Sequence, residues 1–175
     1  KEFWIGESCG KASPNLENKI MNKYFKYFKT ICIHKWYVFV ECYKLGIIWQ
    51  GIIHDMSKFS PSEFFASAKY YNGDGNDYKY QLAWLHHKSH NKHHWEYWVD
   101  WNSSNGEYIL IQIPMKYIKE ICADMIGASK AYNKGKFNKK EPFLYFINNC
   151  KGWQIKEDDR DLIECILLDI QNKTK

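Results

Sequence analysis

The histidines of this 175-residue chain are confined to its middle section. The seven are His34, His54, His86, His87, His90, His93 and His94. His54 is followed directly by Asp55, and Asp124 lies in a later apolar segment. Imidazole nitrogens and carboxylate oxygens together suit divalent transition metals. The order of these residues therefore predicts a metal centre.

Five of the histidines lie within residues 86–94, which we expect to be helical. Residues three, four or seven positions apart share one face of a helix. One face would carry His86, His90 and His93, and another would carry His87, His90 and His94. Either face could turn two or three imidazoles inward, so two of the five histidines are expected at the surface.

Each of these sequence features can also be explained without a metal. A single histidine such as His34 in an apolar helix can be an ordinary buried residue, a His-Asp dipeptide can arise by chance, and a histidine-rich helix can be a solvated face. Asp124 is harder to explain in this way, because an ionised carboxylate in an apolar segment is costly unless it is paired or bound to a cation. The four elements together favour the metal centre.

Helix-period spacing, with capping and stop signals, predicts six or seven helices. They are expected at residues 18–45, 47–53, 60–71, 82–95, from 114 to at least 126, 141–149 and 158–170. Gly46 is a helix stop, whereas Ser60, Pro61 and Glu63 form a capping-box start. Residues 98–113 alternate around a turn-like stretch, which predicts a small hairpin or an extended loop. The predicted class is all-α with room for one small β-hairpin.

Composition predicts one domain over residues 1–175, with the metal-site core at about 20–130 and C-terminal helices over 141–173. Hydrophobic residues make up 45% of the chain and aromatic residues 18%, enough for a packed core. The net charge of +5 is compatible with a small anionic substrate. Basic residues are spread along the chain and form no recognised nucleic-acid motif, so nucleic-acid binding is disfavoured.

Cysteine spacing and hydropathy restrict the class further. No CxxC pair occurs, so the usual thiolate zinc site is excluded. Cys32, Cys122 and Cys165 lie in apolar helical patterns and are expected to be buried free thiols. No apolar run approaches the length of a membrane span and no secretory segment is evident, which predicts a cytoplasmic protein without a membrane partner. The irregular composition of residues 1–15 predicts a lead-in without regular structure.

The motif order resembles the HD-domain superfamily of metal-dependent phosphohydrolases. The resemblance rests on His34-x-x-x-Val38, His54-Asp55-x-x-Lys58, the helical histidines and Asp124, and it covers about residues 20–130. It implies an HD-like helical bundle. The strings His-Asp-Met-Ser-Lys-Phe-Ser-Pro-Ser-Glu-Phe and Asn-Lys-His-His-Trp-Glu-Tyr-Trp look like an uncharacterised family found in bacteria and phages, which implies no activity.

The resemblance also implies a set of metal ligands. The first metal would be bound by His34, His54, Asp55 and Asp124. Asp55 would bridge to a second metal held by His87 and His94, with His86 and His93 as the alternative pair and His90 as a further candidate. Lys58 would contact a substrate phosphate or the bridging water. Glu63, Glu96 and Glu120 are candidates for holding imidazole N–H groups.

The function expected from this resemblance is hydrolysis of a nucleotide or a small phosphate ester by metal-activated water, with Asp55 and Lys58 as catalytic residues. Two divalent ions are expected, with iron or manganese favoured and magnesium, zinc, cobalt or nickel compatible. An HD-type di-iron oxygenase is the first alternative. A non-catalytic metal- or nucleotide-binding protein is the second. The aromatic stretch at 95–101 is compatible with a core or with a homodimer surface.

Overall fold

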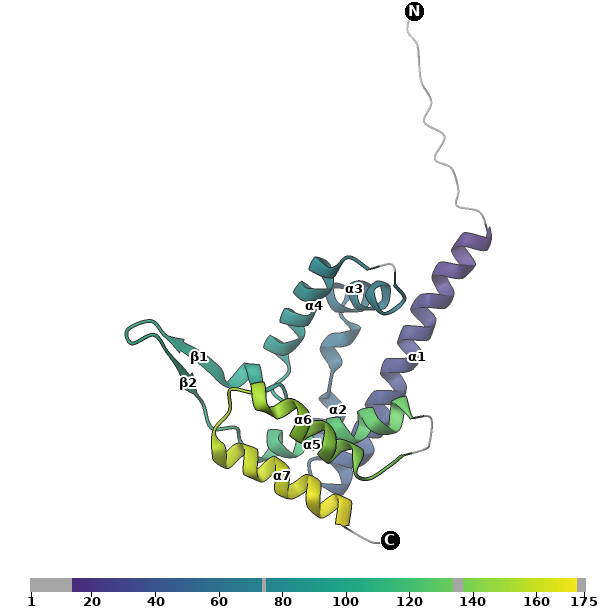
Figure 1. Ribbon diagram of the computed structural model, residues 1–175. Helices are drawn as coiled ribbons and strands as arrows, with labels where there is room; N and C mark the ends of the chain where they lie inside the picture. The colour runs from purple at the N-terminus through teal and green to yellow at the C-terminus, as the bar shows by residue number, and fades with distance from the viewer. Residues whose placement is uncertain (1–13, 74, 134–136, 173–175) are drawn as a thin grey trace, which may run out of the picture.

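The computed structural model describes residues 14–73, 75–133 and 137–172. A hairpin projects from a helical body (Figure 1). The helices are α1 (Pro14–Lys44), α2 (Ile48–Ile53), α3 (Pro61–Tyr71), α4 (Asp77–His90), α5 (Met115–Tyr132), α6 (Glu141–Asn149) and α7 (Glu157–Asn172). The strands are β1 (Val99–Asn102) and β2 (Glu107–Leu110), and the 3₁₀ turns are η1 (Met56–Phe59), η2 (Trp95–Trp98) and η3 (Cys150–Gly152). Over these described ranges, the predicted all-α class is confirmed, since the structure has seven helices, where six or seven were predicted, and one antiparallel hairpin where a hairpin or an extended loop was expected.

Helix boundaries follow local backbone chemistry. Gly46 ends α1 with a φ of +74°, a left-handed conformation that glycine adopts readily. The Ser60 hydroxyl accepts a hydrogen bond from the Glu63 amide at the start of α3. The Glu63 carboxylate does not complete the predicted capping box, because it contacts histidines of α4. Most of the predicted lead-in, residues 1–13, lies outside the described residues.

The end of α4 differs from the prediction. The helix stops at His90, five residues before the predicted end. Asn91 has an extended backbone (φ −116°, ψ 108°), and both its backbone amide and its side-chain amide donate hydrogen bonds to the His87 carbonyl oxygen. The chain then turns, so His93 and His94 lie in the connection to η2 and not on the helix. Helical periodicity did not predict this boundary, because Asn91, the polar residue at which the helix ends, also fits a helical pattern.

Two glycines let α1 approach its neighbours closely. A Cβ atom on Gly127 of α5 would lie 2.5 Å from Val38 Cγ2 and 2.9 Å from the Val38 backbone nitrogen. A Cβ atom on Gly51 of α2 would lie 2.8 Å from Cys42 Cβ. These approaches bring α5 and the segment after α2 beside α1, so that segments far apart in the sequence can contribute to one site.

Gly127→Ala is expected to lower the free energy of unfolding by about 1–3 kcal/mol, because the added methyl group overpacks the α1–α5 contact. Urea denaturation followed by circular dichroism would measure the change. Gly152→Ala is the control, since a Cβ atom there meets nothing within 4 Å. Equal stability of the two variants would contradict the close approach of α1 and α5.

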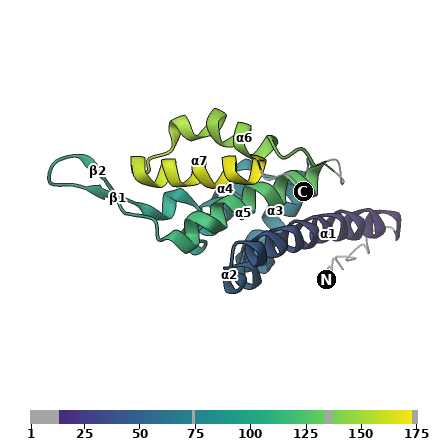
Figure 2. The ribbon, with the colours of Figure 1, turned by 90° about the horizontal axis from the view of Figure 1, so that it is seen from below.

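Three apolar clusters surround α1 and α5. The largest joins α5, α6 and α7 around fully buried Phe146 and Ile163. A second joins α1 and α5 through Val38 and Ala123, and a third joins α1 and α3 through residues that include Ala68. Figure 2 shows α5 between α1 on one side and α6 and α7 on the other. The core therefore holds α1 and α5 in a fixed relation.

The described cysteines divide by exposure. Cys122 is buried as predicted, and burial raises the pKa of its thiol. Cys32 is half-buried, whereas Cys165 is exposed on α7, so the prediction for Cys165 is wrong. Cys165 lies two residues from both Ile163 and Leu167, and therefore on the side of the helix opposite these buried, core-facing residues. Among the described residues, no helix combines the length and the apolar character that a bilayer span requires.

Candidate metal centre

Asp55 lies at the centre of a buried polar cluster. It follows α2 with φ 55° and ψ 22°, a left-handed conformation that is uncommon for a residue with a side chain. The Lys35 ammonium donates hydrogen bonds to the carbonyl oxygens of Ile52 at 2.7 Å and His54 at 2.6 Å, which holds the turn after α2. The turn places the Asp55 side chain in the interior, where the residue is 2% exposed.

One oxygen of Asp55 faces the first group of predicted ligands. His34 Nε2 of α1 lies 3.5 Å from Asp55 Oδ2 and 3.0 Å from Asp124 Oδ1 of α5. His54 Nε2 lies 3.4 Å from Asp55 Oδ2 and 3.5 Å from Asp124 Oδ1. The fold therefore brings together all four residues predicted for the first metal.

The other oxygen of Asp55 faces a second group of histidines. His87 Nε2 of α4 lies 3.3 Å from Asp55 Oδ1, and His93 Nε2 lies 3.4 Å from the same atom. His94 joins them, since one ligand atom from each of these four residues lies within 4.8 Å of the others. Asp55 thus presents a different oxygen to each group, as a carboxylate that bridges two cations would.

Two buried glutamates hold the outer nitrogens of these imidazoles. Glu120 Oε1 lies 3.0 Å from His54 Nδ1 and 3.3 Å from His93 Nδ1, so one carboxylate contacts a histidine of each group. Glu63 Oε2 lies 3.0 Å from His87 Nδ1. When Nδ1–H donates to the carboxylate, Nε2 carries the lone pair and faces the cluster.

Three of the predicted candidates lie outside the cluster. His86 is half-exposed and its Nδ1 lies 2.6 Å from Glu63 Oε1. His90 is exposed and its ring stacks on that of His86 with centroids 3.9 Å apart. Glu96 pairs with Lys88 at 3.2 Å and has no described contact with an imidazole. His86 and His90 lie away from the cluster because α4 turns a single histidine, His87, towards Asp55.

The second group combines the two predicted alternatives. His87 and His94, the favoured pair, lie together, but not as one helical face, because the chain turns between them. His93, predicted only as an alternative, lies with them. The turn at Asn91 is the physical reason, since it redirects two consecutive histidines towards Asp55. Helical spacing contains no signal for this turn.

The charges of the cluster are strongly coupled. Burial opposes ionisation of Asp55, but His54 and Lys58 hold the pKa of its carboxyl group well below the usual range. Lys58 Nζ lies 2.6 Å from Asp55 Oδ2. Burial also opposes a charge on His54, but Asp55 and the neighbouring carboxylates raise its pKa well above the usual value. Positive charge is therefore stabilised at the centre of this cluster.

His94 lies in a different electrostatic environment. Burial, together with the nearby rings of His93 and His87, lowers the pKa of His94 to about 2. Its imidazole is therefore neutral at physiological pH. A neutral imidazole has the lone pair that a metal requires.

The buried nitrogen atoms of the cluster test whether its residues fit a metal. Five imidazole Nε2 atoms are buried and make no hydrogen bond of good geometry within the described residues, and the contacts of four of them are to the carboxylates of Asp55 and Asp124. They belong to His34, His54, His87, His93 and His94. A buried polar atom without a partner costs about 1–3 kcal/mol. Divalent cations would satisfy these nitrogens, and the set of imidazole and carboxylate donors fits transition metals.

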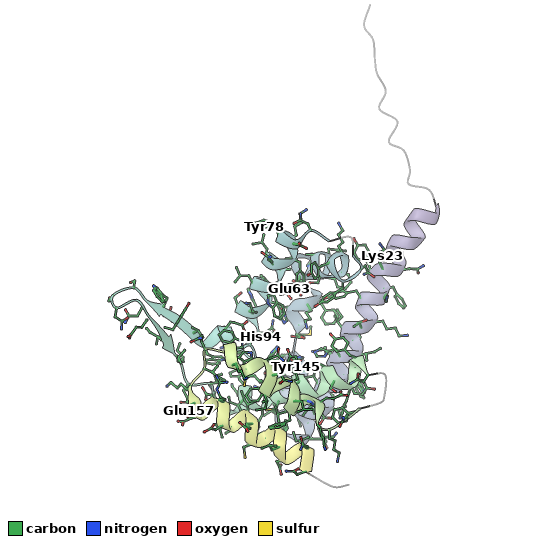
Figure 3. All side chains as sticks on the ribbon, viewed as in Figure 1. Lys23, Glu63, Tyr78, His94, Tyr145 and Glu157 are labelled. Atoms are coloured by element: carbon green, nitrogen blue, oxygen red, sulfur yellow. The ribbon has the colours of Figure 1, made fainter. Side chains whose placement is uncertain are left out.

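A cavity of about 230 Å³ opens beside the cluster. His34, Lys58, Glu63 and His87 line both the cavity and the cluster. Figure 3 shows Glu63 and His94 in the middle of the molecule, near α4. The remaining wall includes five aromatic residues, Tyr27, Tyr71, Tyr80, Trp84 and Tyr132. Neither the distance along the chain nor helical periodicity identifies these aromatic residues, since they come from α1, α3, α4 and α5.

Comparison with known proteins gives a family but no activity. Residues 23–169 match the model of a family of unknown function, and the match includes the whole cluster. No curated protein and no solved structure matches the chain.

Proposed function

The chain belongs to a protein family of unknown function, DUF5662, and we propose that it is a two-metal phosphohydrolase acting on a nucleotide or another small phosphate ester. One observation carries the proposal: Asp55 presents Oδ2 to one group of histidines and Oδ1 to another. The resemblance of the motif order to the HD-domain superfamily supports the same assignment.

The proposed ligands follow from the two oxygens of Asp55. One metal would be held by His34, His54, Asp55 and Asp124, and the other by Asp55, His87, His93 and His94. Mixed imidazole and carboxylate donors favour iron or manganese, and zinc, cobalt or nickel are compatible. Magnesium is less suited to this set because it prefers oxygen ligands.

The chemistry divides between the cations and the side chains. Bound divalent cations lower the pKa of water and neutralise charge on phosphoryl oxygens. Asp55 orients the attacking water from the middle of the site. Lys58 lies on the cavity wall, 2.6 Å from Asp55 Oδ2, and can bind a phosphoryl oxygen whose charge increases in the transition state. Glu63 and Glu120 keep the imidazoles oriented.

The cavity favours a substrate with a flat apolar part. Tyr27 and Tyr71 stack with ring centroids 5.9 Å apart, and Trp84 stacks on His87 at 5.3 Å. Aromatic walls bind planar groups well, and Lys26 adds a second basic residue to the cavity. A nucleotide, which joins a planar base to a phosphate, combines these features.

We expect Lys58→Gln to lower the turnover number by about 100-fold while metal content is retained, because the side chain contacts the substrate and is not a ligand. With manganese- and iron-loaded protein, phosphate release would be measured on a panel of nucleoside monophosphates, and p-nitrophenolate release on bis(p-nitrophenyl) phosphate. Lys79→Gln, on the exposed side of α4, is the matched control and should keep full activity.

The same measurement separates the alternative functions. Dioxygen uptake by the iron-loaded protein, without phosphate release, would overturn the hydrolase and favour a di-iron oxygenase. Metal uptake without either reaction, over the whole panel, would favour a binding protein. Unchanged turnover in Lys58→Gln would contradict the role of that residue.

A further inference from the structure

One side of α1 carries a row of apolar residues, most of them exposed, which we call the α1 stripe. Its members are Met21, Phe25, Phe28, Cys32, Trp36, Phe39 and Tyr43. The successive spacings are 4, 3, 4, 4, 3 and 4 residues. At 3.6 residues per turn, all seven lie within about 80° of one another around the helix axis. Spacings of this kind are typical of a helix that packs along a second helix.

The α1 stripe is largely open to solvent. Met21, Phe25, Phe28, Trp36 and Tyr43 are 44% to 69% exposed. Figure 2 shows α1 along one edge of the molecule, with α5, α6 and α7 on its inner side. A helix that buries one face in its own core needs no second apolar row. Large contiguous apolar patches on a protein surface mark sites of protein–protein contact.

The spacing of the α1 stripe is symmetric about its central residue, Cys32. Its other members lie 4, 7 and 11 positions before Cys32 and 4, 7 and 11 positions after it. Two such helices running in opposite directions would match residue for residue across a twofold axis at Cys32. The facing pairs are Phe28 with Trp36, Phe25 with Phe39, and Met21 with Tyr43. A twofold interface requires a surface that is complementary to itself, and this row meets that requirement.

We propose that the α1 stripe is a homodimer interface, in which the α1 helices of two copies pack antiparallel about a twofold axis near Cys32. The stripe contains no charged residue and is rich in aromatic residues and methionine, the composition of interface cores. The row is also narrow. It fits the seam between two helices better than the broad apolar face with which a helix lies on a membrane.

The surface beside the α1 stripe extends the interface. A groove of about 410 Å³ between α1 and α2 is lined by Cys32, Lys35, Trp36, Phe39, Gly51 and Ile52. Trp49 and Ile52 of α2 are 65% and 48% exposed. Because α2 lies beside the C-terminal half of α1, these residues would contact the N-terminal half of the second copy's stripe. A standard stable interface buries about 800 Å² on each partner. The five exposed stripe residues, together with Trp49 and Ile52, give each copy a row of large apolar side chains for such an interface.

The dimer does not depend on the proposed hydrolase function. His34 and Tyr27, which face the cluster and the cavity, lie on the inner side of α1 and are buried. The α1 stripe is on another side of the same helix, so association leaves the cavity open. The dimer can therefore exist without activity, and activity without the dimer.

Sedimentation equilibrium of the full chain tests the proposal. The wild type is expected to be a dimer at micromolar concentration. Phe25→Glu and Trp36→Glu should each weaken association by about 30-fold or more, because they place charges in the interface. Both side chains are exposed, so the monomer should keep its circular dichroism spectrum. Tyr145→Glu is the matched control: Tyr145 is 57% exposed on α6, and α6 lies on the opposite side of the molecule in Figure 2.

Several results would overturn the dimer. A wild type that stays monomeric at about 100 µM would overturn the proposal, because specific interfaces of standard size are occupied at that concentration. If the Phe25→Glu and Trp36→Glu variants dimerise as strongly as the wild type, the interface lies elsewhere on the molecule. A monomer that binds vesicles of anionic lipid through the stripe would replace the second copy with a membrane surface.

Crosslinking tests the antiparallel direction. Cys9 and Cys165 are replaced by Ser in the background, and Cys42, Cys122 and Cys150 are buried. A short bismaleimide should then join two chains through Cys32, and Cys32→Ser should abolish the product. In the Cys32→Ser background, a chain with Phe25→Cys should crosslink to a chain with Phe39→Cys and not to itself. Self-crosslinking of each variant would instead show parallel helices.

Discussion

Asp55→Asn is expected to reduce bound metal from about two equivalents to one or none, and to lower phosphate release by at least about 1,000-fold. The amide has no negative charge and cannot bridge two cations through two carboxylate oxygens. Asparagine tolerates the left-handed backbone that Asp55 adopts, so the fold should be retained. Elemental analysis of protein purified without an affinity metal would measure the loss.

The histidines provide matched controls for this result. His93→Asn should lose one equivalent, because His93 Nε2 faces Asp55 Oδ1. His90→Asn changes an exposed residue in the same segment of chain, just before the turn that carries His93 to the cluster, and should leave metal content unchanged. Full metal content in Asp55→Asn would contradict the two-metal site. About one equivalent of metal in the wild type would favour a mononuclear hydrolase.

Removal of metal is expected to lower the Tm by at least about 8–16 °C. A cation at one site, present at about 1,000 times its dissociation constant, adds about 4 kcal/mol to the free energy of unfolding, and a second site adds to this value. For a chain of this size, each kcal/mol changes the Tm by about 2–4 °C. Chelation leaves the buried Nε2 atoms of the cluster without a hydrogen bond of good geometry, which adds to the loss of stability.

Differential scanning calorimetry before and after chelation, followed by manganese addition, would measure this change. The Tm should recover when manganese is restored. Asp55→Asn is the control, because its Tm should respond much less to either treatment. A wild type with the same Tm in all three states would show that metal does not bind preferentially to the folded protein.

Helical periodicity and local capping predicted most of the elements. The stop at Gly46, the cap at Ser60 and the helix over 141–149 all depend on neighbouring residues, and the structure confirms them. The end of α4 was not predicted, because the Asn91 amide that terminates it resembles an ordinary polar helical residue. Glu63 was predicted both to cap its helix and to hold an imidazole, and only its contacts in three dimensions distinguish the two.

The sequence by itself determined the helical class and the residue types of the site, because both depend on composition and short-range spacing. His34, His54, Asp55 and Asp124 could be assigned to one metal because their order along the chain resembles the HD-domain pattern, and Asp124 also stands out as a carboxylate in an apolar segment. Only the tertiary structure decided which of the clustered histidines face Asp55. That choice depends on a turn after α4 and on the close packing of α1 against α5 at Gly127, and neither leaves a periodic pattern in the chain.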